Sequence, residues 1–189
     1  MTQGVWLETL TWVEAKSWFA GGAPVLVPIG AIAKEHGHHL PLNTDWMVAR
    51  ELTDRVLDEL PIVAAPVVDF GFYPAFVRYP GSQHLRAETF SAVLKDILEK
   101  LVRDGVRRIA ILNTGVSTEP VVHLAARGLL ESSGVRVHTA DIRRLGLEVE
   151  ATLDQQLGGH GDEAETSMIM AIDRDAVRLD KAVTDYGNM

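Results

Sequence analysis

Hydrophobic residues gather in four short runs along the chain, and these runs are rich in β-branched side chains. The runs cover residues 25–29, 62–68, 109–112 and 135–137. Hydrophobic runs with little alternation are typical of strands that are covered on both faces, as in a parallel sheet. We therefore predict a strand at each run.

Two prolines interrupt this strand pattern. Pro28 lies in the first run and Pro66 in the second. Because proline has no N–H to donate to a neighbouring strand, it is found mostly at sheet edges and at bulges. We expect an edge or a bulge at both positions.

Longer segments with hydrophobic residues at three- and four-residue spacing separate the runs. We predict helices over 44–59, 87–104 and 119–133, and Gly134 ends the last of them. The alternation of strands and helices indicates a layered α/β fold with right-handed crossovers.

Three loops follow the predicted strands and are rich in polar residues and glycine. They cover residues 30–43, 69–86 and 113–118. Open parallel sheets bind ligands at the carboxyl ends of their strands. We therefore expect the three loops to meet there and to build the functional site.

The composition is that of a globular protein, with 47% hydrophobic and 23% charged residues in a chain of 189. This length predicts a single domain over residues 1–189. The net charge of -8 argues against a general nucleic-acid binder, since phosphate neutralisation needs clustered Lys and Arg. The absence of cysteine excludes disulfides, thiolate metal sites and cysteine nucleophiles.

The N-terminus gives the only indication of location. It lacks the basic start and apolar core of a signal peptide, and no apolar run approaches the length that crosses a bilayer. We therefore predict a cytoplasmic protein without a membrane partner.

The segment 34–45 combines residue types that bind metals. Three of the seven histidines fall between His36 and His39, and Asp45 follows shortly afterwards. Imidazole and carboxylate groups are ligands that Zn²⁺ and Mn²⁺ prefer. The segment is therefore a candidate metal-binding loop.

Two interpretations of this loop are open. In the first, Gly37 and Pro41 let the chain fold back so that Asp45 approaches the first histidine. In the second, the loop is only a solvated polar connection, and Asn43 or Thr44 caps the following helix.

A second polar segment, 158–168, contains the other candidate residues. Asp162 and Glu165 have the spacing of an N-cap residue and its N3 carboxylate, so we predict that a helix begins there. Glu163 would then lie in the first turn, free to point elsewhere. His160 is either an ordinary loop histidine or, opposite a metal-binding loop, a candidate general acid or base.

These segments and two others resemble the motifs of the creatininase family, the creatinine amidohydrolases and their relatives, in the right order. The similar segments are Pro28–Ala31 with His36–Asp45, Tyr79–Ser82, Ile111–Asn113 and His160–Ser167. The resemblance covers roughly residues 5 to 180. The chain is identified as a divergent and short member of this family.

The resemblance implies a fold, a chemistry and a set of residues. The fold would be a three-layer α/β/α sandwich with a mostly parallel central sheet, commonly assembled into homo-oligomers. Family members hydrolyse cyclic amides or other non-peptide C–N bonds with one or two divalent metals, here Zn²⁺ or Mn²⁺. By the same resemblance His36, Asp45 and Glu163 match metal ligands, and His160 matches a histidine placed near the substrate.

Two residues before His36 depart from the family pattern. Glu35 is adjacent to the histidine, whereas the family places its glutamate two residues before it. Lys34 stands where that ligand would be. Glu35 is therefore predicted to be either a further metal ligand or a catalytic group that orients His36.

A second departure removes a ligand. The family's Asn-Gly-His is Asn113-Thr114-Gly115 here, and Ser117 stands where creatininases place another acidic ligand. Three consequences are open: a site with one metal, a replacement ligand such as His38 or His39, or no catalysis.

We predict a metal-dependent hydrolase of a small-molecule substrate. A metal-activated water would attack an amide carbonyl, and His160 would relay a proton to the leaving nitrogen. One alternative keeps the metal but cleaves another bond, in a formamide or a cyclic ketone. The other alternative is a catalytically inactive binding or assembly subunit.

Overall fold

A five-stranded, fully parallel sheet forms the centre of the molecule. The structure is a computed structural model and describes residues 3–155 and 157–185. The strand order is β1-β3-β2-β4-β5. The strands are β1 (Val5–Trp6), β2 (Val25–Ile29), β3 (Val63–Ala64), β4 (Ile109–Asn113) and β5 (Val137–Asp141).

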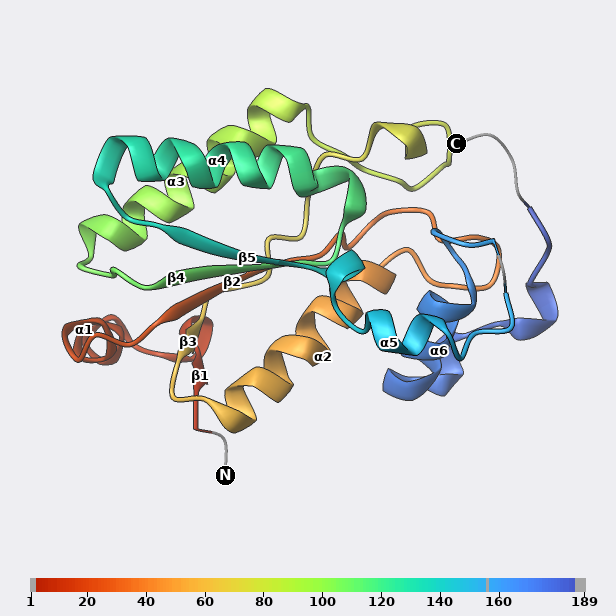
Figure 1. Cartoon of the computed structure of the whole chain (residues 1–189), viewed down its shortest axis with the longest axis horizontal. Helices are drawn as coiled ribbons and strands as arrows, with labels where there is room; N and C mark the ends of the chain where they lie inside the picture. The colour runs from red at the N-terminus through yellow and green to blue at the C-terminus, as the bar shows by residue number, and fades with distance from the viewer. Residues whose placement is uncertain (1–2, 156, 186–189) are drawn as a thin grey trace.

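Helices cover both faces of this sheet (Figure 1). The helices are α1 (Trp12–Ala20), α2 (Thr44–Glu59), α3 (Ala87–Arg103), α4 (Glu119–Ser133), α5 (Leu147–Glu150) and α6 (Glu163–Ile172). Helices α3 and α4 pack side by side over one face, α2 crosses the other, and α6 packs against α2. The predicted three-layer α/β/α sandwich is confirmed.

The hydrophobic core is divided between the two faces because successive side chains of a strand point in opposite directions. Val25 and Val27 of β2 pack with Leu94 and other residues of α3 and α4. Leu26, between them, packs with Leu57 of α2. Both faces of β2 are therefore buried, which explains its uninterrupted hydrophobic sequence.

The prediction of an edge at Pro28 is wrong, since β2 is the central strand and Pro28 pairs with Leu112 of β4. On the β3 side the ladder is irregular: the pairs Leu26–Ala64 and Ile29–Val68 leave one extra residue on the neighbouring segment, as in a bulge. The Pro28 carbonyl accepts from the Val68 N–H at 2.8 Å, so its missing N–H faces the β3 side. Strand β3 has already ended there at Ala64, before Pro66. The absent donor therefore leaves the pairing with β4 intact.

Other differences concern the ends of the chain and the strand boundaries. Strand β1 and helix α1 were not predicted, and the second predicted run, 62–68, contains only the two residues of β3. The fourth run, 135–137, lies just before β5 and overlaps it only at Val137. None of the described helices is long and apolar enough to cross a membrane.

Candidate active site

The loop after β2 folds back onto the start of α2. Gly30 is required for this, since a Cβ at this position would lie 2.5 Å from the carbonyl oxygen of Asp45. Further along, the Lys34 N–H donates to the Leu42 carbonyl at 2.9 Å. The loop thereby brings His36 within hydrogen-bond distance of Asp45, which confirms the predicted return of the chain.

The carboxylate of Asp45 is buried between two basic side chains. Its Oδ1 lies 2.9 Å from Nε2 of His36, and its Oδ2 lies 2.7 Å from Nζ of Lys34. Burial alone would raise the pKa of Asp45, but the charges of Lys34 and His36 and their hydrogen bonds lower it to about 2. Asp45 is therefore an anion at neutral pH.

The ring of His36 is fully buried and faces an oxygen on each side. Its Nδ1 lies 2.8 Å from the Lys34 carbonyl oxygen, which can only accept, so Nδ1 donates a proton there. Its Nε2 faces the ionised Asp45 carboxylate.

Glu35 and His160 form a second pair beside His36. Nε2 of His160 lies 2.9 Å from Oε2 of Glu35, and the rings of His160 and His36 have centroids 4.9 Å apart. Burial raises the pKa of Glu35, but hydrogen bonds from His160 and from the Gly37 N–H lower it more, so that the net shift is downward. The ring of Phe76 packs against that of His160, with the two centroids 4.4 Å apart.

The start of α6 supplies a third acidic group. Asp162 caps the helix as predicted, because its Oδ1 accepts from the Glu165 N–H at 2.9 Å. The Glu165 carboxylate accepts from the Gly161 N–H and lies 3.9 Å from Nδ1 of His160. Glu165 therefore points towards the two histidines.

Glu163 points in another direction. Its Oε2 accepts from the Gln155 N–H at 2.7 Å, and its own N–H donates to the Gln155 side chain at 2.8 Å. These two bonds hold the segment before α6 against the helix.

The four residues predicted as metal ligands do not all lie together in this structure. Of that set, only His36 and Asp45 are in contact, while Glu35 binds His160 and Glu163 binds Gln155. His36, His160 and Glu165 instead offer ligand atoms that all lie within 4.8 Å of one another. Two imidazoles and one carboxylate are a donor set found in catalytic zinc sites, where a further position stays open for water.

The suggested replacement ligands are not members of this group. Nε2 of His39 is hydrogen-bonded to Oγ1 of Thr166 at 2.8 Å. Burial, together with the charge of His38, lowers the pKa of His39. Neither His38 nor His39 belongs to a cluster of three metal-ligating residues in the described part of the chain.

A cleft of about 730 Å³ opens beside the site. It runs between the start of α6 and the segment 179–185, and His39, His160, Glu163 and Thr166 are among the residues that line it. The cleft therefore gives access to His160 from the α6 side, whereas His36 is not among the residues that line it. Lys34 and Asp45 lie deeper, beside a cavity of only about 10 Å³.

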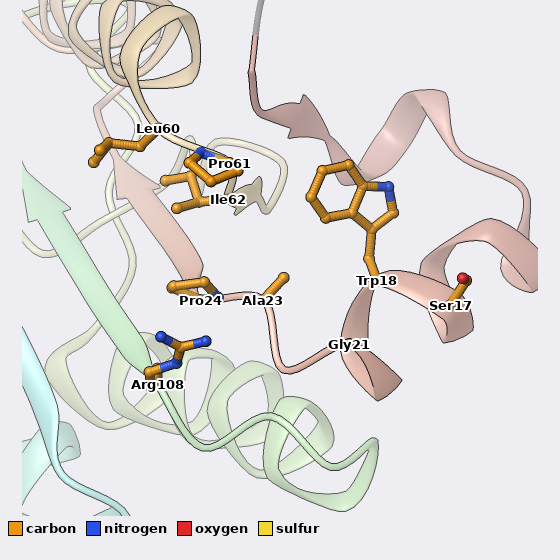
Figure 2. Close-up of a pocket in the computed structure, with 9 residues that line it drawn as sticks. All are labelled: Ser17, Trp18, Gly21, Ala23, Pro24, Leu60, Pro61, Ile62 and Arg108. Carbon is orange, nitrogen blue, oxygen red and sulfur yellow. The ribbon is translucent and has the colours of Figure 1, made fainter.

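Another hollow, of about 690 Å³, lies at the opposite end of the sheet (Figure 2). Trp18 stands on one side of it, and Leu60–Ile62 and Arg108 stand on the other. Arg108 is the single ionisable side chain among the residues that line it, and its guanidinium donates to the Gly22 carbonyl. This hollow therefore lacks the acid and base groups of an active site.

Sequence reasoning missed a second cluster of metal-ligating types, formed by Glu119, His123 and Asp141. Asp141 ends β5 and accepts from Nδ2 of Asn113 at 3.0 Å, while Glu119 is paired with Arg144 at 3.3 Å. Both acids are therefore already bound to donors, and no spacing along the chain connects the three residues. Lys34 and Glu165 were also not among the predicted site residues.

Comparison with known proteins identifies the family. The family model described as "Creatininase: Creatinine amidohydrolase" matches residues 8–188. A creatinine amidohydrolase of Pseudomonas putida is 26% identical, over 97% of this chain and 77% of its own length. A mycofactocin precursor peptide peptidase of Mycolicibacterium smegmatis is also 26% identical, over 84% of this chain but only 62% of its own length.

Solved structures agree with these relatives. A manganese creatininase superposes with a TM-score of 0.83 and 25% identity, covering 96% of this chain and 78% of the other. A creatininase variant of Zn–Zn type gives the same values. Similar structures thus include manganese and zinc forms, and His36, His160 and Glu165 form a candidate ligand group in this chain. From these matches, the chain belongs to the creatininase family.

Proposed function

We propose that this protein hydrolyses an amide-type C–N bond in a small molecule, with one divalent metal ion. The main support for the proposal is that His36, His160 and Glu165 lie close together beside a cleft of about 730 Å³. The bond class is supported by the names of the relatives, an amidohydrolase and a peptidase. Because the amidohydrolase covers more of this chain, we favour a non-peptide amide, such as a cyclic one.

Zn²⁺ or Mn²⁺ would be held by His36, His160 and Glu165. When bound, such an ion lowers the pKa of a water molecule and polarises the substrate carbonyl. Nδ1 of His36 donates to the Lys34 carbonyl, an outer contact typical of metal-binding histidines. Nε2 of the same ring is then the ligand atom.

Glu35 acts in this proposal as a positioning residue for His160. Its carboxylate keeps the proton of His160 on Nε2, which leaves the lone pair of Nδ1 on the side of Glu165. Phe76 packs on the same ring and shields it from water. In this proposal Glu165 takes the ligand role predicted for Glu163, because the Glu163 carboxylate would have to give up its bond from the Gln155 N–H.

Metal content tests the proposal directly. We expect purified wild type to contain about one Zn or Mn per chain by elemental mass spectrometry. His36→Ala and Glu165→Ala should lose this metal and at least about 100-fold of the hydrolysis rate, measured on a panel of creatinine, other cyclic amides, formamides and short peptides. Glu163→Ala is the matched control and should keep the metal.

Two results would contradict this assignment. Loss of metal in Glu163→Ala but not in Glu165→Ala would return the ligand role to Glu163. A wild type that takes up no metal, and cleaves nothing in the panel, would favour the inactive binding subunit. A cytoplasmic location and a homo-oligomeric state stay predictions.

A further inference from the structure

Lys34 places a charged amine in the interior of the site. The residue is only 6% exposed, and its Nζ lies 2.7 Å from Oδ2 of Asp45. Its backbone is fixed on both sides, because its N–H donates to Leu42 and its carbonyl accepts from Nδ1 of His36. The position of the amine is therefore set by the loop and not by a freely moving surface side chain.

The surroundings of this amine suit an ammonium ion. Asp45 provides a buried negative charge, and the Phe76 ring provides a π face 5.2 Å from Nζ. A buried charge is tolerated only when it is paired, and the anion and the aromatic ring together meet this condition.

The same surroundings do not suit a metal ion. The small cavity beside Lys34 and Asp45 has a volume of about 10 Å³, roughly enough for one water molecule. Among the described residues that line it, Asp45 provides the one carboxylate, and no imidazole is present. A divalent ion at Oδ2 would therefore be repelled by the neighbouring ammonium group for as long as Lys34 is present.

We propose that the ammonium group of Lys34 is the permanent cation of this site and occupies the place beside Oδ2 of Asp45 that a second metal ion would need. A similar solved structure is of Zn–Zn type, whereas this chain would combine one exchangeable metal ion with one built-in cation. The inference does not depend on the proposed hydrolysis, because its test reads metal number and thermal stability and not turnover.

The test begins with wild type, titrated with ZnCl₂ and MnCl₂ and followed by calorimetry and native mass spectrometry. Wild type should bind no more than about one ion per chain. In EDTA, Lys34→Ala should lower the Tm by on the order of 10 °C, since Oδ2 of Asp45 loses its charged partner in a buried position. Added Mn²⁺ should then restore roughly half of this loss and raise the metal number by about one per chain over wild type.

Two control variants isolate the role of the charge. The double variant Lys34→Ala/Asp45→Asn has no anion to neutralise, so it should gain neither the extra metal nor the Mn²⁺-dependent rise in Tm. Lys100→Ala removes an exposed lysine paired with Asp104, and should change the Tm by only about 1–2 °C.

The proposal is overturned if wild type binds two metal ions per chain, or if Lys34→Ala keeps the wild-type Tm in EDTA. A measurement on wild type alone covers the case in which Lys34→Ala does not fold. The ¹⁵N resonance of the Lys34 amine should be that of an ammonium group and should persist at saturating Zn²⁺. Its disappearance on zinc binding would show that the metal displaces the amine.

Discussion

Asp45 and His160 show how neighbouring side chains determine the state of a functional group. Asp45 stays ionised in a buried position because Lys34 and His36 lie within hydrogen-bond distance of its two oxygens. Nε2 of His160 is hydrogen-bonded to the carboxylate of Glu35. The chemistry at this site therefore depends on contacts that determine which atoms carry protons.

Removal of the Glu35 carboxylate tests this dependence. In Glu35→Ala, Nε2 of His160 loses its acceptor, so the ring is no longer held in one orientation or tautomer. We expect affinity for Zn²⁺ to fall about 10–100-fold in a calorimetric titration. Glu35→Gln keeps an acceptor oxygen and should retain most of the affinity. Equal losses in both variants would indicate that the charge of Glu35, and not its hydrogen bond to His160, supports the metal.

At the scale of the elements, the start of α6 aims Glu165 at the histidines. The side chain of Asp162 caps this helix, and it also accepts from the Gly159 N–H. The first turn of α6 is thereby fixed against the loop that contains His160. The cap thus contributes to both the stability and the geometry of the site.

We expect Asp162→Ala to lower the free energy of unfolding by about 1 kcal/mol in urea and to weaken Zn²⁺ binding. The matched control is Thr11→Ala, which removes the N-cap of α1 and its reciprocal contact with Glu14. This control should destabilise the protein by a similar amount and leave Zn²⁺ affinity unchanged. If both variants weakened the metal equally, general destabilisation would explain the effect.

At the scale of the whole molecule, the sheet and its two helical layers hold the strand ends in place. Leu94 of α3 is fully buried and belongs to the cluster that contains Ile111 of β4 and Val122 of α4. This cluster includes β4, the strand that ends at Asn113, so core packing also fixes the strand end from which the loop 113–118 begins. The prediction of one domain over residues 1–189 agrees with a single described sheet but stays a prediction.

Leu94→Ala should lower the free energy of unfolding by about 2–5 kcal/mol, since it removes buried methyl groups and leaves a cavity. Leu124 of α4 is 61% exposed, and Leu124→Ala should change stability by no more than about 0.5 kcal/mol. Urea denaturation of the two variants gives the comparison. A small effect of Leu94→Ala would mean that the layers repack around the vacated space.

The sequence alone determined the layered fold, the loops that build the site and the start of α6. A strand that is buried on both faces has a continuous hydrophobic run, as in residues 25–29. A helix with one buried face has hydrophobic residues at three- and four-residue spacing. These signals are local, so they can be read without knowledge of neighbours in space. The pairing of His36 with Asp45 could also be predicted, because both residues lie in one loop that glycine and proline allow to turn.

The tertiary structure alone decided which side chains face one another across segments. Glu163 and Glu165 are only two residues apart, and their roles separate because Gln155 binds the first while the second faces His160. Pro28 is tolerated in the central strand because β3 has already ended on the side that its missing N–H would face. The sequence aligned Lys34 with a ligand position of the family, but only the fold shows that it is buried against Asp45. These outcomes depend on which side chains meet in space, which local patterns do not encode.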